Sequence, residues 1–434
     1  MLSKWLYTKT KKVVVFTLTT AIAMQGNIPT MAQDHDRACV EESYTGQWLT
    51  QDGVYAYPVT PENPEWAEMD YVEQVRACDM PQELVNSLST DELVQVALDY
   101  PLMLDCMLFD SYERGVEHLA MTSNVYRELL EREDVAETLL SAYLNLDVDY
   151  DMLATGGLTR NPFAESDYDK EIMLQSLLSS EVIFSALDEA QTEKLMEVLG
   201  DKYEEKKGKC DNFRTAMTFY EALSERVGYI DGKLIPESLQ GDVINATVSA
   251  GFVKTSIFPG NYSGTGTLCY VGKYLLYGLD KDDAAECYEY ISGDLSKQEQ
   301  DACNAQIEST HPKWIRLSTA TNKYNCHSYC WIDNSYDNIY WLPDPQVYAS
   351  SSAFTNRGAN TSIAGHDSYI IIYDEERPAH SVRSKTGSDG TSMVSYMTTT
   401  TVISKLGSYG VYQTTLYDMY NLYDGRYYIS YNKK

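Results

Sequence analysis

Residues 321–332 have the sequence TNKYNCHSYCWI, which places Cys326, His327 and Cys330 among three aromatic residues. A polar, loop-like segment precedes Cys326, and the residues that follow have the pattern of a short amphipathic helix. Three kinds of site fit this composition: a metal site, a disulfide, or a cysteine nucleophile with its base elsewhere in the chain.

The first two alternatives are disfavoured by spacing. A closed zinc site needs four ligands, usually supplied as two pairs, and no second Cys/His pair follows Cys330. A bond between Cys326 and Cys330 is also disfavoured, because residues one helical turn apart rarely meet disulfide geometry. We therefore expect no metal and no cofactor, and we favour a nucleophile.

Cys326 is the candidate nucleophile because a helix N-terminus stabilises a thiolate. The base has to come from elsewhere in the fold, and His380 follows a predicted strand and a charged turn, at the start of a second extended segment. His366 competes for this role, but it lies in a turn beside Gly365. His327 is adjacent to Cys326, and neighbouring helical residues point away from each other.

These motifs carry a family resemblance. Residues 325–329, NCHSY, resemble the Asp/Asn-Cys-x-x-aromatic helix start of NlpC-type cell-wall cysteine peptidases and related CHAP amidohydrolases, within the papain-like superfamily. Residues 363–367, IAGHD, are similar to the turn before the histidine strand, and residues 379–382, AHSV, resemble that strand. With SKLGSYGVYQ further on, the pattern is similar to a group of secreted bacterial proteins, in which the position of Cys330 is commonly a small residue.

The resemblance covers residues 306–434 and implies an α+β, papain-like domain, with a cysteine-bearing helix on an antiparallel sheet. It implies that Cys326 attacks an amide carbonyl, that His380 is the base, and that Ser404 on the next strand orients His380. The implied function is an exported cysteine peptidase or amidase that cleaves amide bonds, with peptidoglycan or a peptide as substrate. The alternative is an exported, non-catalytic interaction protein with a degenerate peptidase-like domain.

The N-terminus has the three parts of a secretory signal. Residues 1–12 are basic, residues 13–24 are apolar, and Thr30 and Ala32 define a cleavage site before Gln33. We predict a signal peptide over residues 1–32, a secreted or cell-envelope location, and no stable membrane span after cleavage. Export permits disulfides, and nine cysteines leave at least one without an intrachain partner.

Charge divides the chain. The net charge is −30, yet residues 306–434 contain 11 Lys and Arg and 11 Asp and Glu, so the whole negative charge lies upstream. Such an acidic chain is unsuited to binding nucleic acid through its phosphates. We predict an all-α acidic domain over residues 33–205, a mixed segment with short strands over 206–305, and the peptidase-like domain over 306–434. The acidic domain is a candidate for binding a protein partner.

Local signals predict individual elements. Ser89 with Glu92, and Ser296 with Glu299, form capping-box patterns at helix starts, and Gly200 is expected to end a helix. In the last third, residues 367–376 have a strand pattern, 391–407 a hairpin or two strands, and 410–420 another strand. Residues 423–434 have the pattern of a hairpin end, with Asp424-Gly425 in the turn.

Overall fold

The structure is a computed structural model, and residues Leu49–Lys434 form one compact unit, separate from Met1–Trp48. The predicted signal peptide and its cleavage site lie outside the described residues. The residues that the structure describes are 48, 55–109, 112–151, 167–209, 229–230, 233–234, 252–253, 268–276, 279–290, 294–363, 365–374 and 377–434.

The N-terminal part of the compact unit is helical, as predicted. Its described 3-10 helices are η1 (Pro64–Glu68) and η2 (Met103–Leu108). Its described α-helices are α3 (Tyr71–Ala77), α4 (Gln82–Ser87), α5 (Thr90–Leu98), α6 (Tyr112–Thr122), α7 (Asn124–Glu131), α8 (Val135–Asn145), α10 (Asp167–Ser179), α11 (Glu181–Phe184) and α12 (Glu189–Lys209).

Both predicted capping boxes are confirmed. The Ser89 Oγ accepts from the Glu92 backbone N–H at 3.3 Å, and the Glu92 carboxylate accepts from the Ser89 N–H at 2.8 Å, at the start of α5. The same reciprocal pair joins Ser296 and Glu299 at the start of α15 (Lys297–Thr310). Each box satisfies two backbone donors that a helix N-terminus leaves unpaired.

The prediction that Gly200 ends a helix is wrong, because α12 continues through it to Lys209. A glycine within a helix costs about 1 kcal/mol relative to alanine. Packing of α12 before and after Gly200 along the chain outweighs this cost. Leu195 and Leu199 are buried before the glycine, and Lys206 forms a buried ion pair with Glu171 beyond it, at 3.0 Å.

The C-terminal part is built on a seven-stranded antiparallel sheet in the order β6-β12-β11-β10-β9-β13-β8. The architecture is therefore α+β, with a helical N-terminal region and an antiparallel C-terminal sheet, as predicted. The strands are β6 (Ile315–Arg316), β8 (Phe354–Ala359), β9 (Tyr369–Asp374), β10 (Arg377–Ser384), β11 (Thr401–Lys405), β12 (Val411–Thr415) and β13 (Tyr427–Lys433).

Two predicted strand segments are partly helical. Residues 391–407 contain α18 (Met393–Thr399) before β11, because the Ser392 side chain caps the helix by accepting from the Ser395 N–H. Residues 410–420 contain β12 and then most of α19 (Leu416–Leu422), which the Thr415 side chain caps. Asp424, with φ of 51°, occupies the predicted turn. That turn joins α19 to β13, so the predicted hairpin is wrong.

A second sheet has the order β3-β4-β5-β7, with β3 at Phe252–Val253, β4 at Leu268–Tyr274, β5 at Ala285–Tyr290 and β7 at Tyr340–Trp341. A short two-stranded sheet pairs β1 (Tyr229–Ile230) with β2 (Lys233–Leu234). The strands β1 to β5 lie within residues 206–305, where short strands were expected, and much of residues 206–267 lies outside the described part.

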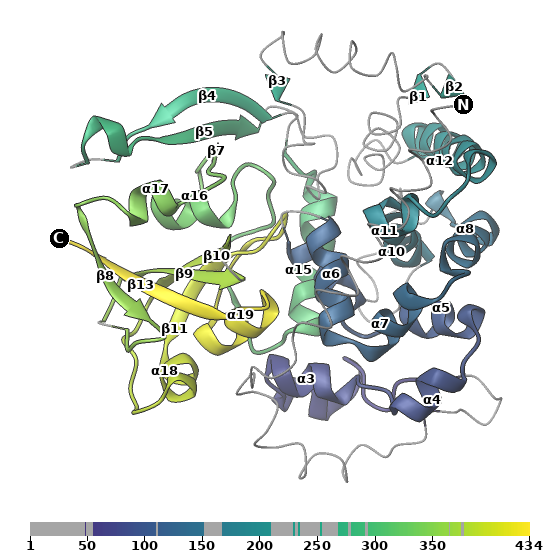
Figure 1. Cartoon of the computed structure of the whole chain (residues 1–434), viewed down its shortest axis with the longest axis horizontal. Coiled ribbons are helices and arrows are strands. Elements are labelled where there is room, and N and C mark those ends of the chain that lie inside the picture. The colour runs from purple at the N-terminus through teal and green to yellow at the C-terminus, as the bar shows by residue number, and fades with distance from the viewer. Residues whose placement is uncertain are drawn as a thin grey trace, which may run out of the picture. The chain divides into compact units, whose positions relative to one another are not determined.

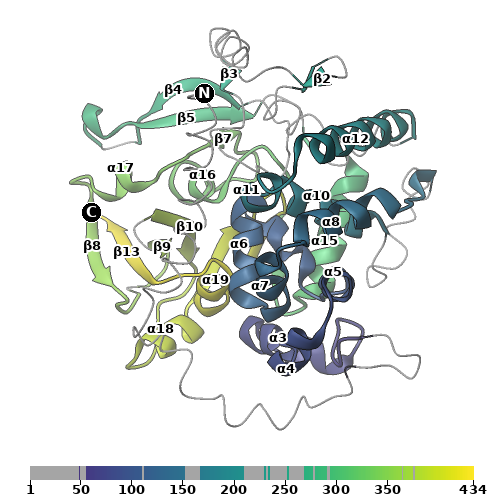
Figure 2. The same cartoon turned by 45° about the vertical axis from the view of Figure 1, so that its right-hand side comes forward.

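The seven-stranded sheet has helices on both faces. Figures 1 and 2 show α16 (Cys326–Trp331) and α17 (Gln346–Ala349) on one face, and α18 and α19 on the other. We call these the α16 face and the α19 face. On the α16 face, Cys330 and Trp331 share a core with Ile371 and Tyr431 of the sheet.

The helical region contacts the C-terminal part through buried polar groups. The Trp66 indole N–H donates to the Thr310 carbonyl at 2.8 Å, and the Tyr423 hydroxyl donates to the Leu108 carbonyl at 2.7 Å. Because both carbonyls accept side-chain donors, these contacts fix the two parts together through polar as well as apolar interactions.

Candidate functional site

Cys326 is the first residue of α16, as predicted. The Asn325 side chain caps this helix by accepting from the Ser328 N–H at 3.0 Å, and its amide donates to the Leu342 carbonyl at 3.0 Å. The cap therefore anchors the helix start to the segment after β7. Cys326 is only 3% exposed, so its sulfur has the electrostatic advantage of a helix N-terminus but little access to solvent.

His380 lies on β10 and is 1% exposed. Its Nε2 is in hydrogen-bond contact with the Ser404 Oγ on β11, and its ring stacks on Tyr423 with a centroid separation of 3.6 Å. Burial holds the pKa of His380 well below its ordinary value, and electrostatic interactions with His327 and Lys405 lower it further. The imidazole is therefore neutral at physiological pH.

The register of the sheet decides which way these side chains point. Side chains alternate between faces along a strand, and residues opposite each other in an antiparallel pair share a face. Ser381 pairs with Ile371, which belongs to the core under α16. His380 therefore points to the other face, where Tyr423 follows α19.

The α16 contacts agree with this assignment. The Ser381 Oγ lies 2.7 Å from the His327 Nδ1 and accepts from the Trp331 indole N–H at 3.2 Å, so two side chains of α16 contact the residue next to His380. The structure thus brings His380 and Ser404 together on the α19 face. Cys326 begins α16, the helix that contacts the opposite face of the sheet through His327 and Trp331.

A serine–histidine pair that the sequence did not reveal lies on the α16 face. Because Trp331 donates to the Ser381 oxygen, the Ser381 hydroxyl hydrogen is available to the His327 Nδ1. Burial lowers the pKa of His327 to about 3, so this imidazole is neutral and accepts. No sequence signal predicts this contact, because the two residues are 54 positions apart.

Cys330 has a packing role. Its thiol donates to the Val382 carbonyl of β10, with a separation of 3.3 Å, and it is not bonded to Cys326. Burial raises the pKa of Cys330 to about 12, although the Arg383 charge opposes this shift. The side chain is therefore a neutral thiol within the core.

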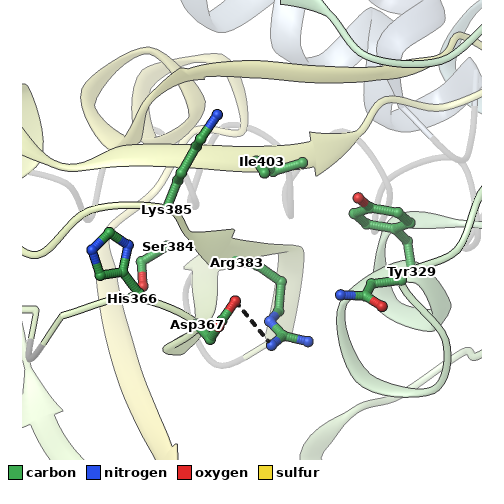
Figure 3. Close-up of a pocket in the computed structure, with 8 residues that line it drawn as sticks. Tyr329, His366, Asp367, Arg383, Ser384, Lys385 and Ile403 are labelled. Carbon is green, nitrogen blue, oxygen red and sulfur yellow. Dashed lines mark ion pairs between the residues drawn. The ribbon is translucent and has the colours of Figure 1, made fainter.

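An open pocket of about 320 Å³ lies beside α16, where β10 ends. Figure 3 shows Arg383, Lys385 and His366 around it, with Asp367 paired to Arg383 at 3.5 Å. The complete lining consists of Tyr329, Asn334, His366, Asp367, Arg383, Ser384, Lys385 and Ile403. His366 is thus a pocket residue. In the sequence it was the alternative to His380 as the candidate base.

Comparisons of the chain with family models, curated proteins and solved structures found no match. Among the described residues, no three His, Cys, Asp or Glu side chains are grouped so that they would hold a metal ion. Within that same part of the chain, none of the helices has the length and apolar character needed to span a membrane.

Proposed function

We propose that this chain is an exported, non-catalytic interaction protein with a degenerate papain-like domain at its C-terminal end. The observation that carries the proposal is the position of His380, which points to the α19 face, whereas Cys326 belongs to the helix on the α16 face. Cysteine peptidase chemistry needs the thiol and the imidazole within about 3 Å of each other, because the base removes the thiol proton directly.

The surroundings of His380 support this proposal. Tyr423 covers one face of its ring, and the Tyr423 hydroxyl is in turn bonded to Leu108 of the helical region. A general base has to exchange protons with its substrate, so an imidazole that is 1% exposed and lies between a tyrosine and a serine is better suited to packing.

The acidic charge supports binding of a protein partner. All of the net charge of −30 lies upstream of residue 306, which favours a partner with a basic surface because complementary charge speeds association and fixes orientation. A charge-driven interaction of this kind weakens as the salt concentration rises.

The experiment compares purified cell wall digested by the wild type and by Cys326→Ala. We expect indistinguishable muropeptide profiles from the two proteins. Release of new muropeptides by the wild type, lost in Cys326→Ala with unchanged folding by circular dichroism, would overturn the proposal. An active cell-wall hydrolase in the same assay is the positive control, and it shows that the purified wall can be digested.

A second candidate function is the cysteine peptidase itself. Two observations favour it: Cys326 begins a capped helix, and His380 contacts Ser404. For His380 to face α16, β10 has to shift by one residue, which moves every side chain to the other face. A register irregularity between Pro378 and His380 lies at this position, and bulges of this kind redirect side chains.

Thiol alkylation distinguishes the two functions without a substrate. A cysteine activated by His380 reacts with iodoacetamide at neutral pH faster than a free thiol, and His380→Ala slows that reaction. Under the interaction-protein proposal, Cys326 reacts more slowly than glutathione, and His380→Ala does not slow it further. Peptide mass spectrometry assigns the label to Cys326.

A further inference from the structure

We propose that the pocket beside α16 binds the carboxylate of a small organic anion, such as the C-terminal residue of a peptide, through Arg383 and Lys385. The inference rests on the proposed binding function, since it names a ligand class for this region. It concerns the α16 face and involves neither His380 nor Ser404.

Arg383 provides the fixed part of this site. Its guanidinium lies 4.3 Å from the centre of the Tyr369 ring, which holds the plane of the group. Its buried Nε has no hydrogen-bond partner, and its terminal nitrogens have only long contacts of 3.5 Å, to Asp367 and to the Cys330 carbonyl. A planar guanidinium with unused N–H donors is suited to donate to the two oxygens of a carboxylate.

The charge around the pocket is positive. Lys385 is exposed at the rim, and its Nζ lies 2.5 Å from the Gln413 side-chain oxygen, so its ammonium has capacity for another acceptor. The one acidic group in the lining, Asp367, is 80% exposed and sits at a long distance from Arg383. A ligand carboxylate therefore competes with a weakly held, solvated side chain.

The remaining walls determine the shape of the ligand. The Tyr329 ring and Ile403 form an apolar side, and these two residues pack in one cluster. The pocket volume of about 320 Å³ lies at the small end of ligand sites. An apolar wall next to a guanidinium fits a carboxylate attached to an apolar group, as at the end of a peptide.

The test is isothermal titration calorimetry of the full mature chain with N-acetyl-leucine, N-acetyl-leucinamide and inorganic phosphate. We expect saturable binding of N-acetyl-leucine and at least about tenfold weaker binding of the amide, because the amide has the same shape without the charge. Absent binding, equal binding of the amide, or tighter binding of phosphate would each overturn the proposal.

Two single substitutions with opposite expected effects keep the proposal testable. Lys385→Gln should weaken binding about fivefold, and Asp367→Asn should strengthen it about threefold by removing the competing carboxylate. Asparagine tolerates the positive φ of 61° at position 367, so the fold should be retained. Lys297→Gln, at an exposed lysine of α15, is the matched control and should bind as the wild type does. Unchanged binding in Lys385→Gln, or weaker binding in Asp367→Asn, contradicts the proposal.

The two proposals fail independently. Cys326-dependent digestion of cell wall overturns the non-catalytic function without changing the affinity for N-acetyl-leucine. Lack of binding by N-acetyl-leucine overturns the carboxylate site and leaves the cell-wall result as it was.

Discussion

The rings of His380 and Tyr423 stack with a centroid separation of 3.6 Å and an interplanar angle of 8°. His380 belongs to β10, and Tyr423 follows α19, so the stack fixes this histidine on the α19 face. The Tyr423 hydroxyl extends the connection to the Leu108 carbonyl in the helical region. One tyrosine therefore links the candidate base to a carbonyl that lies 315 residues before that tyrosine in the chain.

The contribution of Tyr423 to stability is testable with a pair of variants. Tyr423→Ala removes the ring and leaves a cavity, so we expect it to lower the free energy of unfolding by about 3 to 5 kcal/mol. Tyr423→Phe removes only the hydroxyl and leaves the Leu108 carbonyl unpaired, with an expected loss of about 1 to 2 kcal/mol. Urea unfolding followed by circular dichroism measures both, and equal losses would contradict a role for the ring.

The buried histidines predict acid sensitivity. Burial lowers the pKa of His327 to about 3 in the folded state, whereas an unfolded histidine has a pKa of about 6.5. Below pH 6.5 the unfolded state therefore binds more protons than the folded state. The stabilisation associated with the neutral, buried His327 is complete above that pH and is lost as the pH falls towards 3. At pH 5 the loss from His327 is about 2 kcal/mol.

The measurement is the free energy of unfolding at pH 7.5 and at pH 5 for the wild type and for His327→Gln. We expect a smaller difference between the two pH values in the variant, because one buried histidine no longer titrates. His380 also has a lowered pKa, so part of the acid sensitivity should remain. An identical pH dependence in the two proteins would show that His327 is not buried as a neutral ring.

A buried ion pair in the helical region predicts a large effect of charge removal. Glu171 is fully buried, 3.0 Å from the Lys206 Nζ and 2.8 Å from the Tyr150 hydroxyl. Glu171→Gln removes the countercharge of a buried ammonium and should cost about 3 to 5 kcal/mol. The control is Glu197→Gln in the exposed pair with Lys194, for which we expect less than about 1 kcal/mol. Similar losses in chemical unfolding would contradict the buried pair.

Cys330 should be chemically inert in the folded protein. Burial raises the pKa of its thiol to about 12, and thiols react as thiolates. We expect no labelling of Cys330 by iodoacetamide at pH 7.5 in the native state and complete labelling in urea, read by peptide mass spectrometry. Rapid native labelling would show that the thiol is accessible, contrary to its position against Val382.

Local sequence signals predicted the elements whose causes are themselves local. The capping boxes at Ser89 and Ser296 form as expected, and α16 begins at Cys326, since each depends on hydrogen bonds within a few residues. The predictions from the sequence were wrong where packing with distant residues, or a side-chain cap, determined the type or the end of an element. Packing carries α12 through Gly200, and Ser392 begins a helix where β-branched and aromatic residues suggested a strand.

The sequence by itself thus determined an acidic helical region, a cysteine at the start of a short helix, and a histidine on a strand of an antiparallel sheet. Only the tertiary structure decided that His380 stacks on Tyr423, while Ser381 faces α16. The physical reason is the two-residue period of a strand, in which one position of register exchanges the two faces. That register depends on pairing and packing across the whole sheet, which the order of motifs along the chain does not contain.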